Sequence, residues 1–372
     1  MKHYAVRSAL AFLAGIAIAA MPAAVRAQVT ANPPYSVSTF VSAASLPKGV
    51  SAPDSITFSP TDVFIGYSNG GAPDGSGGAV SNVIEYDFTG KQLQNIRIVG
   101  HNDGLRYNPL KNQLWALQNE DGNANLDVID LRNGTQTIYQ LGTGPHGGGY
   151  DDIVFNNKSA YLSASAPNIN PNTAPAILSI TLKGKKATLT GILNGNATAT
   201  EVTTGKSVTL NLQDPDSMIL NARGELVMTS QGDGELIIVQ NPGLKCQNAL
   251  VVPLTSEAGG STIGDTQLDD TVFTIRSSGE LLVADKGLNA VYSITAPYFG
   301  PAAYSAVSVF ASPSDSTPIE SFVGQTDLTT GFVSPIVTGM SNPGGMAFIP
   351  SDADLKNFVK DSVEVPEGCP QS

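Results

Sequence analysis

The chain has 372 residues, with 38 glycines, 24 prolines and a formal net charge of −12. This acidic balance argues against a binder of nucleic acid or of anionic membranes, because both surfaces require clustered lysine and arginine. It suits the binding of cations or, more simply, the solubility of an exported protein. After the first 27 residues only His101 and His146 remain, which argues against a histidine-rich zinc or copper site.

The N-terminal segment has the three-part layout of a cleaved secretory signal peptide. Lys2 and Arg7 precede an apolar stretch at 9–21, and residues 25–27 form a small-residue cleavage boundary. The stretch is shorter than the roughly 20 residues that span a bilayer. We therefore expect residues 1–27 to be removed, leaving no membrane span, with an uncleaved anchor as the alternative. The loss of three basic residues and no acid changes the formal charge from −12 to −12 − 3 = −15. We expect a secreted or periplasmic protein.

The remaining chain consists of short β-branched and aromatic runs, separated by Gly, Asn, Asp and Ser turns. No long helical period is present, so the pattern is typical of many short strands. The expected strands include residues 37–41, 63–67, 83–88, 96–99, 114–117, 128–131, 138–141, 177–182, 226–228 and 236–239.

One unit recurs along these strands: a turn that contains an acid or amide, an apolar strand, a second turn and a second strand. The copies begin at Asp54, Asn102, Asp151, Asp216, Asp269 and Asn342, and the first spacings are 102 − 54 = 48 and 151 − 102 = 49 residues. A period of about 40–50 residues is typical of propeller blades. The third unit absorbs a polar insert at 194–206, which we expect to be an outer-edge loop. The fifth copy places strand 279–283 directly after strand 269–275.

We therefore predict an all-β fold: a single β-propeller at 28–350 with six blades of four antiparallel strands, five or seven blades being the alternatives. Residues 37–41 are expected to close the ring, and residues 351–372 form a C-terminal tail. A pair of β-sandwiches does not explain the repeat. Cys246 and Cys369 are the only cysteines, and in an oxidising compartment they predict one disulfide that ties the tail to a loop.

Acidic residues stand at the start of the predicted inner strands. In a propeller these positions meet at one mouth of the central channel, where they would form an oxygen-rich ring. Calcium binds six to eight oxygen ligands, and carboxylates without a cation repel one another and raise their own pKa values. The pattern therefore predicts a bound divalent cation, with calcium favoured. The alternative is that each side chain caps its own turn. The acids and amide are Asp54, Asn102, Asp103, Asp151, Asp152, Asp216, Asp269 and Asp270.

The register resembles that of the six-bladed propellers of the senescence-marker-protein and gluconolactonase family. Four motifs carry this resemblance: Asp54 before Phe58, Asn102-Asp103-Gly104, Asp151 before Phe155, and Pro215-Asp216-Ser217. The resemblance implies that Asp54, Asn102, Asp151 and Asp216 are metal ligands. The chain departs from the family pattern in having Asp54 in place of Glu, Asp151 in place of Asn, and Ser217 in place of Gly.

The resemblance also implies hydrolysis of a lactone or ester, in which the cation polarises the carbonyl and stabilises the developing oxyanion. Asp216 is expected to accept a proton from the attacking water. His146, in the Gly-rich stretch 144–149, is a second catalytic candidate, with a rigid loop residue as the alternative. His101, Asp103 and Asp270 are expected to contact a small-molecule substrate. The other class of function is a monomeric, non-catalytic scaffold that binds a protein, peptide or glycan.

Overall fold

The computed structural model describes residues 28–156, 159–264, 266–274, 278–312, 315–351 and 369. The predicted signal peptide, and the predicted tail apart from residues 351 and 369, lie outside the described residues, so cleavage and export stay predictions. The described chain is almost entirely β-strand, with the short 3-10 helices η1 (Ala43–Ser45) and η2 (Ser76–Gly78). Within these ranges no helix has the length and apolar character needed to cross a membrane.

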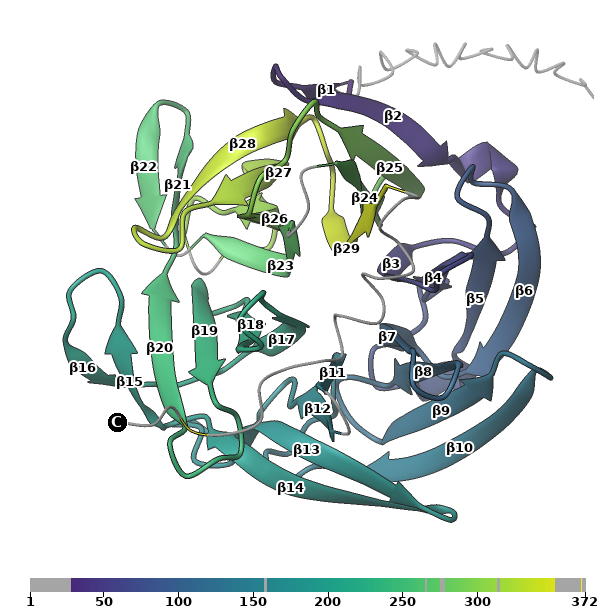
Figure 1. Ribbon diagram of the computed structural model, residues 1–372, viewed down its shortest axis with the longest axis horizontal. Coiled ribbons are helices and arrows are strands. Elements are labelled where there is room, and N and C mark those ends of the chain that lie inside the picture. Colours follow the sequence, from purple (N-terminus) through teal and green to yellow (C-terminus); the bar gives the residue numbers. More distant parts are fainter. Residues whose placement is uncertain are drawn as a thin grey trace, which may run out of the picture.

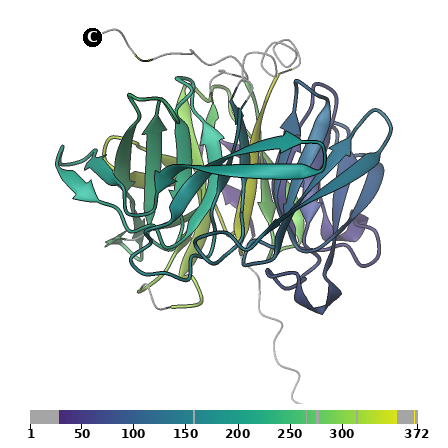
Figure 2. The same ribbon diagram turned by 90° about the horizontal axis from the view of Figure 1, so that it is seen from below.

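In the described part of the chain the strands form six sheets. The sheets surround a central axis (Figure 1). Figure 2 gives the side view, in which many of the strands run through the thickness of the ring. This arrangement confirms the predicted all-β propeller. The six inner strands contact one another in a closed ring: β3 (Pro53–Phe58), β7 (Asn102–Asn108), β11 (Ile153–Asn156), β17 (Pro215–Leu220), β23 (Gln267–Thr274) and β29 (Pro343–Pro350).

In four of the sheets the inner strand and the next three strands of the chain form an antiparallel unit. After β3 come β4 (Val63–Tyr67), β5 (Val80–Tyr86) and β6 (Gln92–Val99). After β7 come β8 (Gln113–Gln118), β9 (Ala124–Asp130) and β10 (Thr135–Gly142). After β11 come β12 (Ser159–Ser163), β13 (Pro175–Lys183) and β14 (Lys186–Asn194). After β17 come β18 (Leu226–Ser230), β19 (Glu235–Gln240) and β20 (Asn248–Pro253).

The last two sheets are interlaced. After β23 the chain enters the neighbouring sheet as β24 (Gly279–Asp285) and β25 (Ala290–Thr295). It then returns to the sheet of β23 as β26 (Ala302–Val309), β27 (Glu320–Thr326) and β28 (Phe332–Thr338), and ends in the other sheet as β29. The prediction that strand 279–283 follows strand 269–275 in one blade was therefore wrong. Apolar periodicity identifies a strand, whereas its pairing partner depends on the whole ring.

Two hairpins extend the outer edges of adjacent sheets. The polar insert at 194–206, expected to be a loop, contributes β15 (Thr198–Glu201), and β16 (Ser207–Thr209) completes the hairpin on the outer side of β20. The hairpin of β21 (Thr255–Ala258) and β22 (Ser261–Gly264) pairs with β28 in the same way. In both hairpins the first strand runs parallel to the sheet strand that it extends.

Both ends of the chain contribute to ring closure. β2 (Ser36–Val41) is the outer strand of the sheet whose inner strand is β29, and β1 (Thr30–Ala31) pairs with β28. This confirms that residues 37–41 close the ring, which joins the two chain ends and removes exposed edges. The disulfide between Cys246, in the loop after β19, and Cys369 is present.

The core lies between neighbouring sheets. Middle strands such as β4 are buried along their whole length, so both faces of each sheet pack against a neighbour. Each fully buried aliphatic or aromatic side chain contributes about 1.5–3 kcal/mol. This packing on two sides of every sheet fixes the ends of the inner strands relative to one another.

Candidate functional site

A β-bulge recurs where the inner strands begin. In β3, β7, β17, β23 and β29 two residues oppose a single residue of the partner strand. Such bulges bend a strand locally and redirect a side chain. The bulge pairs are Asp54-Ser55, Asp103-Gly104, Asp216-Ser217, Asp269-Asp270 and Gly344-Gly345. Asp151 and Asp152 hold the equivalent place before β11, where both exchange backbone hydrogen bonds with Ser163.

These bulges meet at a cavity of about 200 Å³ at one mouth of the ring. The residues that directly follow a second strand also reach it, because that strand runs antiparallel to the inner strand and ends at the same mouth. The cavity is lined by ten acids, Asp54, Asp103, Glu120, Asp121, Asp151, Asp152, Asp214, Asp216, Asp269 and Asp270. The two cationic lining residues are Arg106 and Lys286.

Asp103 lies at the centre of this acidic group. Its carboxyl group hydrogen-bonds with those of Asp54, Asp151 and Glu120. Burial, and then the charge of Glu120, raise the pKa of Asp103 to about 7. Burial, and then the charge of Asp216, raise the pKa of Asp151 well above its usual value. So many adjacent carboxyl groups cannot all be ionised unless a cation or shared protons compensate them.

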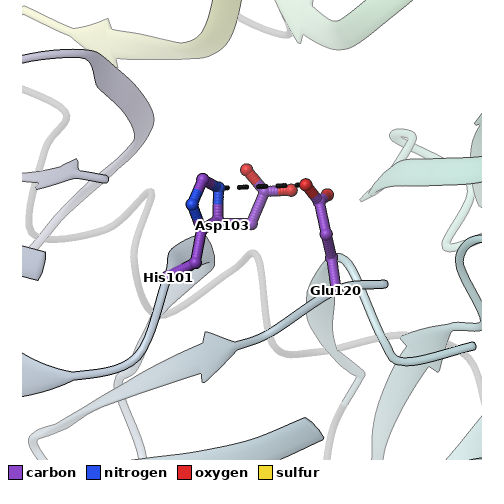
Figure 3. Close-up of side chains that lie close together, drawn as sticks. All are labelled: His101, Asp103 and Glu120. Carbon is purple, nitrogen blue, oxygen red and sulfur yellow. Dashed lines mark ion pairs between the residues drawn. The ribbon is translucent and has the colours of Figure 1, made fainter. Parts of the chain in front are cut away.

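A histidine joins this group, as Figure 3 shows. One ligand atom each from His101, Asp103 and Glu120 lies within 4.8 Å of the others, and Nε2 of His101 is 3.8 Å from Oε1 of Glu120. Nδ1 of His101 is 2.8 Å from the carbonyl oxygen of Gly71. Because a carbonyl only accepts, Nδ1 donates to it, and Nε2 is the ring nitrogen directed toward the acids. Metal-binding histidines are commonly held in this way.

The two cationic residues occupy different parts of the mouth. Nζ of Lys286 is 2.7 Å from Oδ2 of Asp54 and 3.9 Å from Oδ1 of Asp269. Nη2 of Arg106 is 2.6 Å from Oδ2 of Asp152 and also donates to the carbonyl oxygen of Met218 at 3.0 Å. Arg106 therefore links three neighbouring inner strands, whereas Lys286 neutralises one side of the acidic ring.

The second residues of the bulges link neighbouring strands. Asp152 accepts from the backbone N–H of Met218 at 2.9 Å, and Asp270 accepts from that of Met346 at 2.7 Å. The hydroxyl of Ser55 donates to the carbonyl oxygen of Asp103. Asp270, expected to contact substrate, lines the cavity with a carboxylate already engaged by the neighbouring strand.

The structure brings Asp54, Asp103, Asp151 and Asp216 together in the cavity, with His101 at its edge. Their predicted roles as ligands or substrate contacts stay predictions. Asn102 does not line the cavity: its side-chain amide is buried and donates to the carbonyl oxygen of Leu117 at 2.8 Å. The bulge explains this, since it turns Asp103 toward the mouth and leaves Asn102 facing the neighbouring sheet.

His146 also lies away from the cavity lining. Its ring is fully buried, and Nε2 is 2.7 Å from the carbonyl oxygen of Gly149. Burial lowers its pKa below the usual value. The ring therefore serves as a buried part of its Gly-rich loop, in agreement with the structural alternative considered for it.

Sequence reasoning missed Glu120, Lys286 and Arg106. Lys286 directly follows β24, and Glu120 lies two residues after the end of β8. The antiparallel geometry of the second strand, applied to every repeat, would have placed both at the mouth. Arg106 carries no such signal, because its position within β7 resembles that of any residue on an inner strand.

No family model matches the sequence, and no curated protein matches it. Similar solved structures include a protein of unknown function from Bacteroides caccae, with 11% identity and a TM-score of 0.47 over 82% of this chain and 88% of that one. The periplasmic gluconolactonase of Pseudomonas aeruginosa is 12% identical, with a TM-score of 0.44 over 80% and 88% of the two chains. A hypothetical selenium-binding protein from Sulfolobus tokodaii is 11% identical, with a TM-score of 0.41 over 82% and 70%.

A gluconolactonase is thus among the solved structures to which the chain is similar, at 12% identity. The names of these similar proteins differ. At such identities and TM-scores none of them assigns an activity to this chain.

Proposed function

We propose that the mouth cavity binds a divalent cation at His101, Asp103 and Glu120, and that the protein hydrolyses a small polar lactone or ester there. The observation that carries this proposal is the carboxyl group of Asp103, which is buried against three other carboxyl groups beside the Nε2 of His101. A divalent ion is the simplest compensation for such a group. One imidazole and two carboxylates form a donor set that fits it.

The proposed ligands differ from the set expected from the sequence, which was Asp54, Asn102, Asp151 and Asp216. Asp54 already has the ammonium group of Lys286 as its partner, and Asn102 faces away from the cavity. Besides Asp54, the acids that contact Asp103 are Glu120 and Asp151, which lie on the side of β7 and β11. An imidazole ligand also suits transition-metal ions, whereas calcium takes oxygen ligands alone, so the favoured ion shifts from calcium toward manganese or zinc.

When bound, such an ion would polarise a carbonyl group and lower the pKa of a bound water. Asp216 is suited to accept the proton, because its buried carboxyl group lines the same cavity and its pKa lies well above the usual value. Burial is the largest cause of that shift, followed by the charge of Asp269. His146 has no part in this proposal, because its Nε2 is held by the loop.

The sequence resemblance supplies the lactone or ester as substrate class. The cavity supports a small hydroxyl-rich molecule, because its many carboxyl groups accept hydrogen bonds from hydroxyls. A monomeric state and the absence of nucleic-acid binding stay predictions.

Calorimetry on chelator-treated protein tests the proposal, with manganese, zinc and calcium as titrants. We expect one ion per chain in the wild type, and an affinity at least about 100-fold weaker in Asp103→Asn and Glu120→Gln. Glu257→Gln, which changes an exposed acid on the outer hairpin, is the matched control and should bind normally. A chelator should abolish hydrolysis of a lactone and ester panel. Wild-type protein that binds none of these ions would overturn the proposal and leave the scaffold function.

A further inference from the structure

The sixth inner strand breaks the pattern of the other five. Five strands place an aspartate at the first bulge position or its equivalent: Asp54, Asp103, Asp151, Asp216 and Asp269. β29 has Gly344 at this position. A Cβ on Gly344 would lie 3.1 Å from Oδ2 of Asp269, 3.2 Å from Oδ1 of Asp54 and 3.4 Å from Cε of Lys286. The space that a sixth aspartate would need is therefore bounded by the carboxylates of Asp269 and Asp54 and by the stem of Lys286.

Lys286 enters this space from a firmly held backbone. It directly follows β24, the second strand of the sheet that contains β29, and its N–H donates to the carbonyl oxygen of Asn342 at 2.9 Å. The preceding Asp285 accepts from the N–H groups of Ser341 at 2.9 Å and Asn342 at 3.1 Å. The lysine is thus oriented by the fold, in contrast to a solvated surface lysine.

The ammonium group is surrounded by oxygen atoms. It lies 2.7 Å from Oδ2 of Asp54 and faces Oδ1 of Asp269 at 3.9 Å. Burial lowers the pKa of Lys286. The negative charges around it, of Asp54, Asp269, Asp103 and Glu120, together raise the pKa by more, so that it lies well above the usual value. The ion pair with Asp54 therefore favours the cationic form of the side chain.

We propose that Lys286 is a tethered cation that fills a second divalent-cation position, bounded by Asp54 and Asp269, and so confines the exchangeable ion to the side of His101. That the exchangeable ion is confined to the side of His101 rests on the proposed function. The second cation position at Asp54 and Asp269 does not depend on it. Without the ammonium group, the oxygen atoms of Asp54 and Asp269 would both border the space beside Gly344, with no imidazole among them. An all-oxygen set of this kind selects calcium over transition-metal ions.

The variant Lys286→Met tests this, because methionine keeps an unbranched apolar stem and removes the charge. Calcium is counted by calorimetry and by elemental analysis on chelator-treated, then calcium-saturated protein. We expect one calcium ion per chain more than in wild type. Lys48→Met, at an exposed lysine, is the matched control and should give the wild-type count. Lys286→Arg retains the charge and should also give the wild-type count.

The double variant Asp54→Asn with Lys286→Met removes both partners and should lose the additional ion. If Lys286→Met folds only with calcium present, while the double variant folds without calcium, the inference is supported. A folded Lys286→Met protein with the wild-type calcium count would overturn the inference, as would failure to fold in calcium when the double variant folds. If wild type binds no ion and Lys286→Met binds one, the proposed function fails and this inference stands.

Discussion

At the scale of single residues, the mouth shows how burial separates the roles of chemically similar groups. Asp216 and Asp270 both have buried carboxyl groups with pKa values well above the usual range, and burial is the largest cause in each. Both carboxylate oxygens of Asp270 already accept a hydrogen bond, one from the N–H of Thr271 and one from the N–H of Met346. Within the described part of the chain, the hydrogen-bond donor to the carboxylate of Asp216 is the hydroxyl of Ser217, at 3.4 Å, so this carboxylate remains available to a ligand.

This difference leads to a prediction about Asp216. Asp216→Asn removes the proposed proton acceptor while it leaves His101, Asp103 and Glu120 in place. We expect hydrolysis to fall by about 10²–10⁴-fold, the usual contribution of a general base, with cation affinity changed far less. Steady-state kinetics on a lactone or ester substrate, paired with calorimetry, measures both quantities.

His146→Gln is the comparison for Asp216→Asn. It removes a buried ring outside the cavity lining, so we expect lower thermal stability and retained activity per folded molecule. Full activity in Asp216→Asn, or loss of activity in folded His146→Gln, would reverse the roles assigned to the two residues.

At the scale of elements, the site depends on the repeated bulge. The bulge in β7 is tightly packed: a Cβ on Gly104 would lie 2.1 Å from the carbonyl oxygen of Asp151 and 2.9 Å from Cα of Asp152. Glycine is required there because the inner strands of two sheets approach so closely.

Gly104→Ala is therefore expected to lower the free energy of unfolding by about 1–3 kcal/mol through overpacking. It should also weaken cation binding, since it pushes the Asp151 backbone away from Asp103. Gly122→Ala is the control, because a Cβ at Gly122 meets no atom within 4 Å. Denaturant unfolding and calorimetry on both variants provide the check, and equal stabilities would mean that the strands are free to separate.

The strand register and the acids at the mouth were predictable because both are local patterns. The turn, acid and apolar strand recur near Asp54, Asn102 and Asp151, and ring geometry places such starts together. The choice between Asn102 and Asp103 was not predictable, because it depends on which of the two residues lies in the bulge. The interlacing of the last two sheets was also hidden, since residues 279–283 have the same apolar pattern whichever sheet they join.

At the scale of the whole molecule, the acidic cavity makes stability depend on pH. The pKa values of Asp214 and Asp269 are about 6 and that of Asp103 is about 7, against an ordinary value of 3.8. The folded chain therefore keeps protons that the unfolded chain has lost between about pH 4 and pH 7. In this window the free energy of unfolding falls as pH rises.

We expect chelator-treated protein to be less stable at pH 8 than at pH 5 by at least about 1.4 kcal/mol, the worth of one pKa unit on one group. A divalent cation should restore much of this loss at pH 8 and have little effect at pH 5. Denaturant unfolding at both pH values, with and without the cation, measures the effect. Burial also raises the pKa of Asp127, outside the cavity lining, to about 6, so Asp127→Asn should reduce the pH dependence without changing the cation response.

The interlaced order of the last two sheets sets when the cavity becomes complete during synthesis. Lys286 is held by Asn342, and Asp285 by Ser341 and Asn342, so the lysine has no fixed seat until the segment just before β29 has emerged. A nascent chain that ends before this segment carries Asp54, Asp269 and Lys286 without the backbone contacts that orient the lysine. The arrangement of charged groups at the mouth is therefore complete only after β29, the last strand of the described chain, has been synthesised.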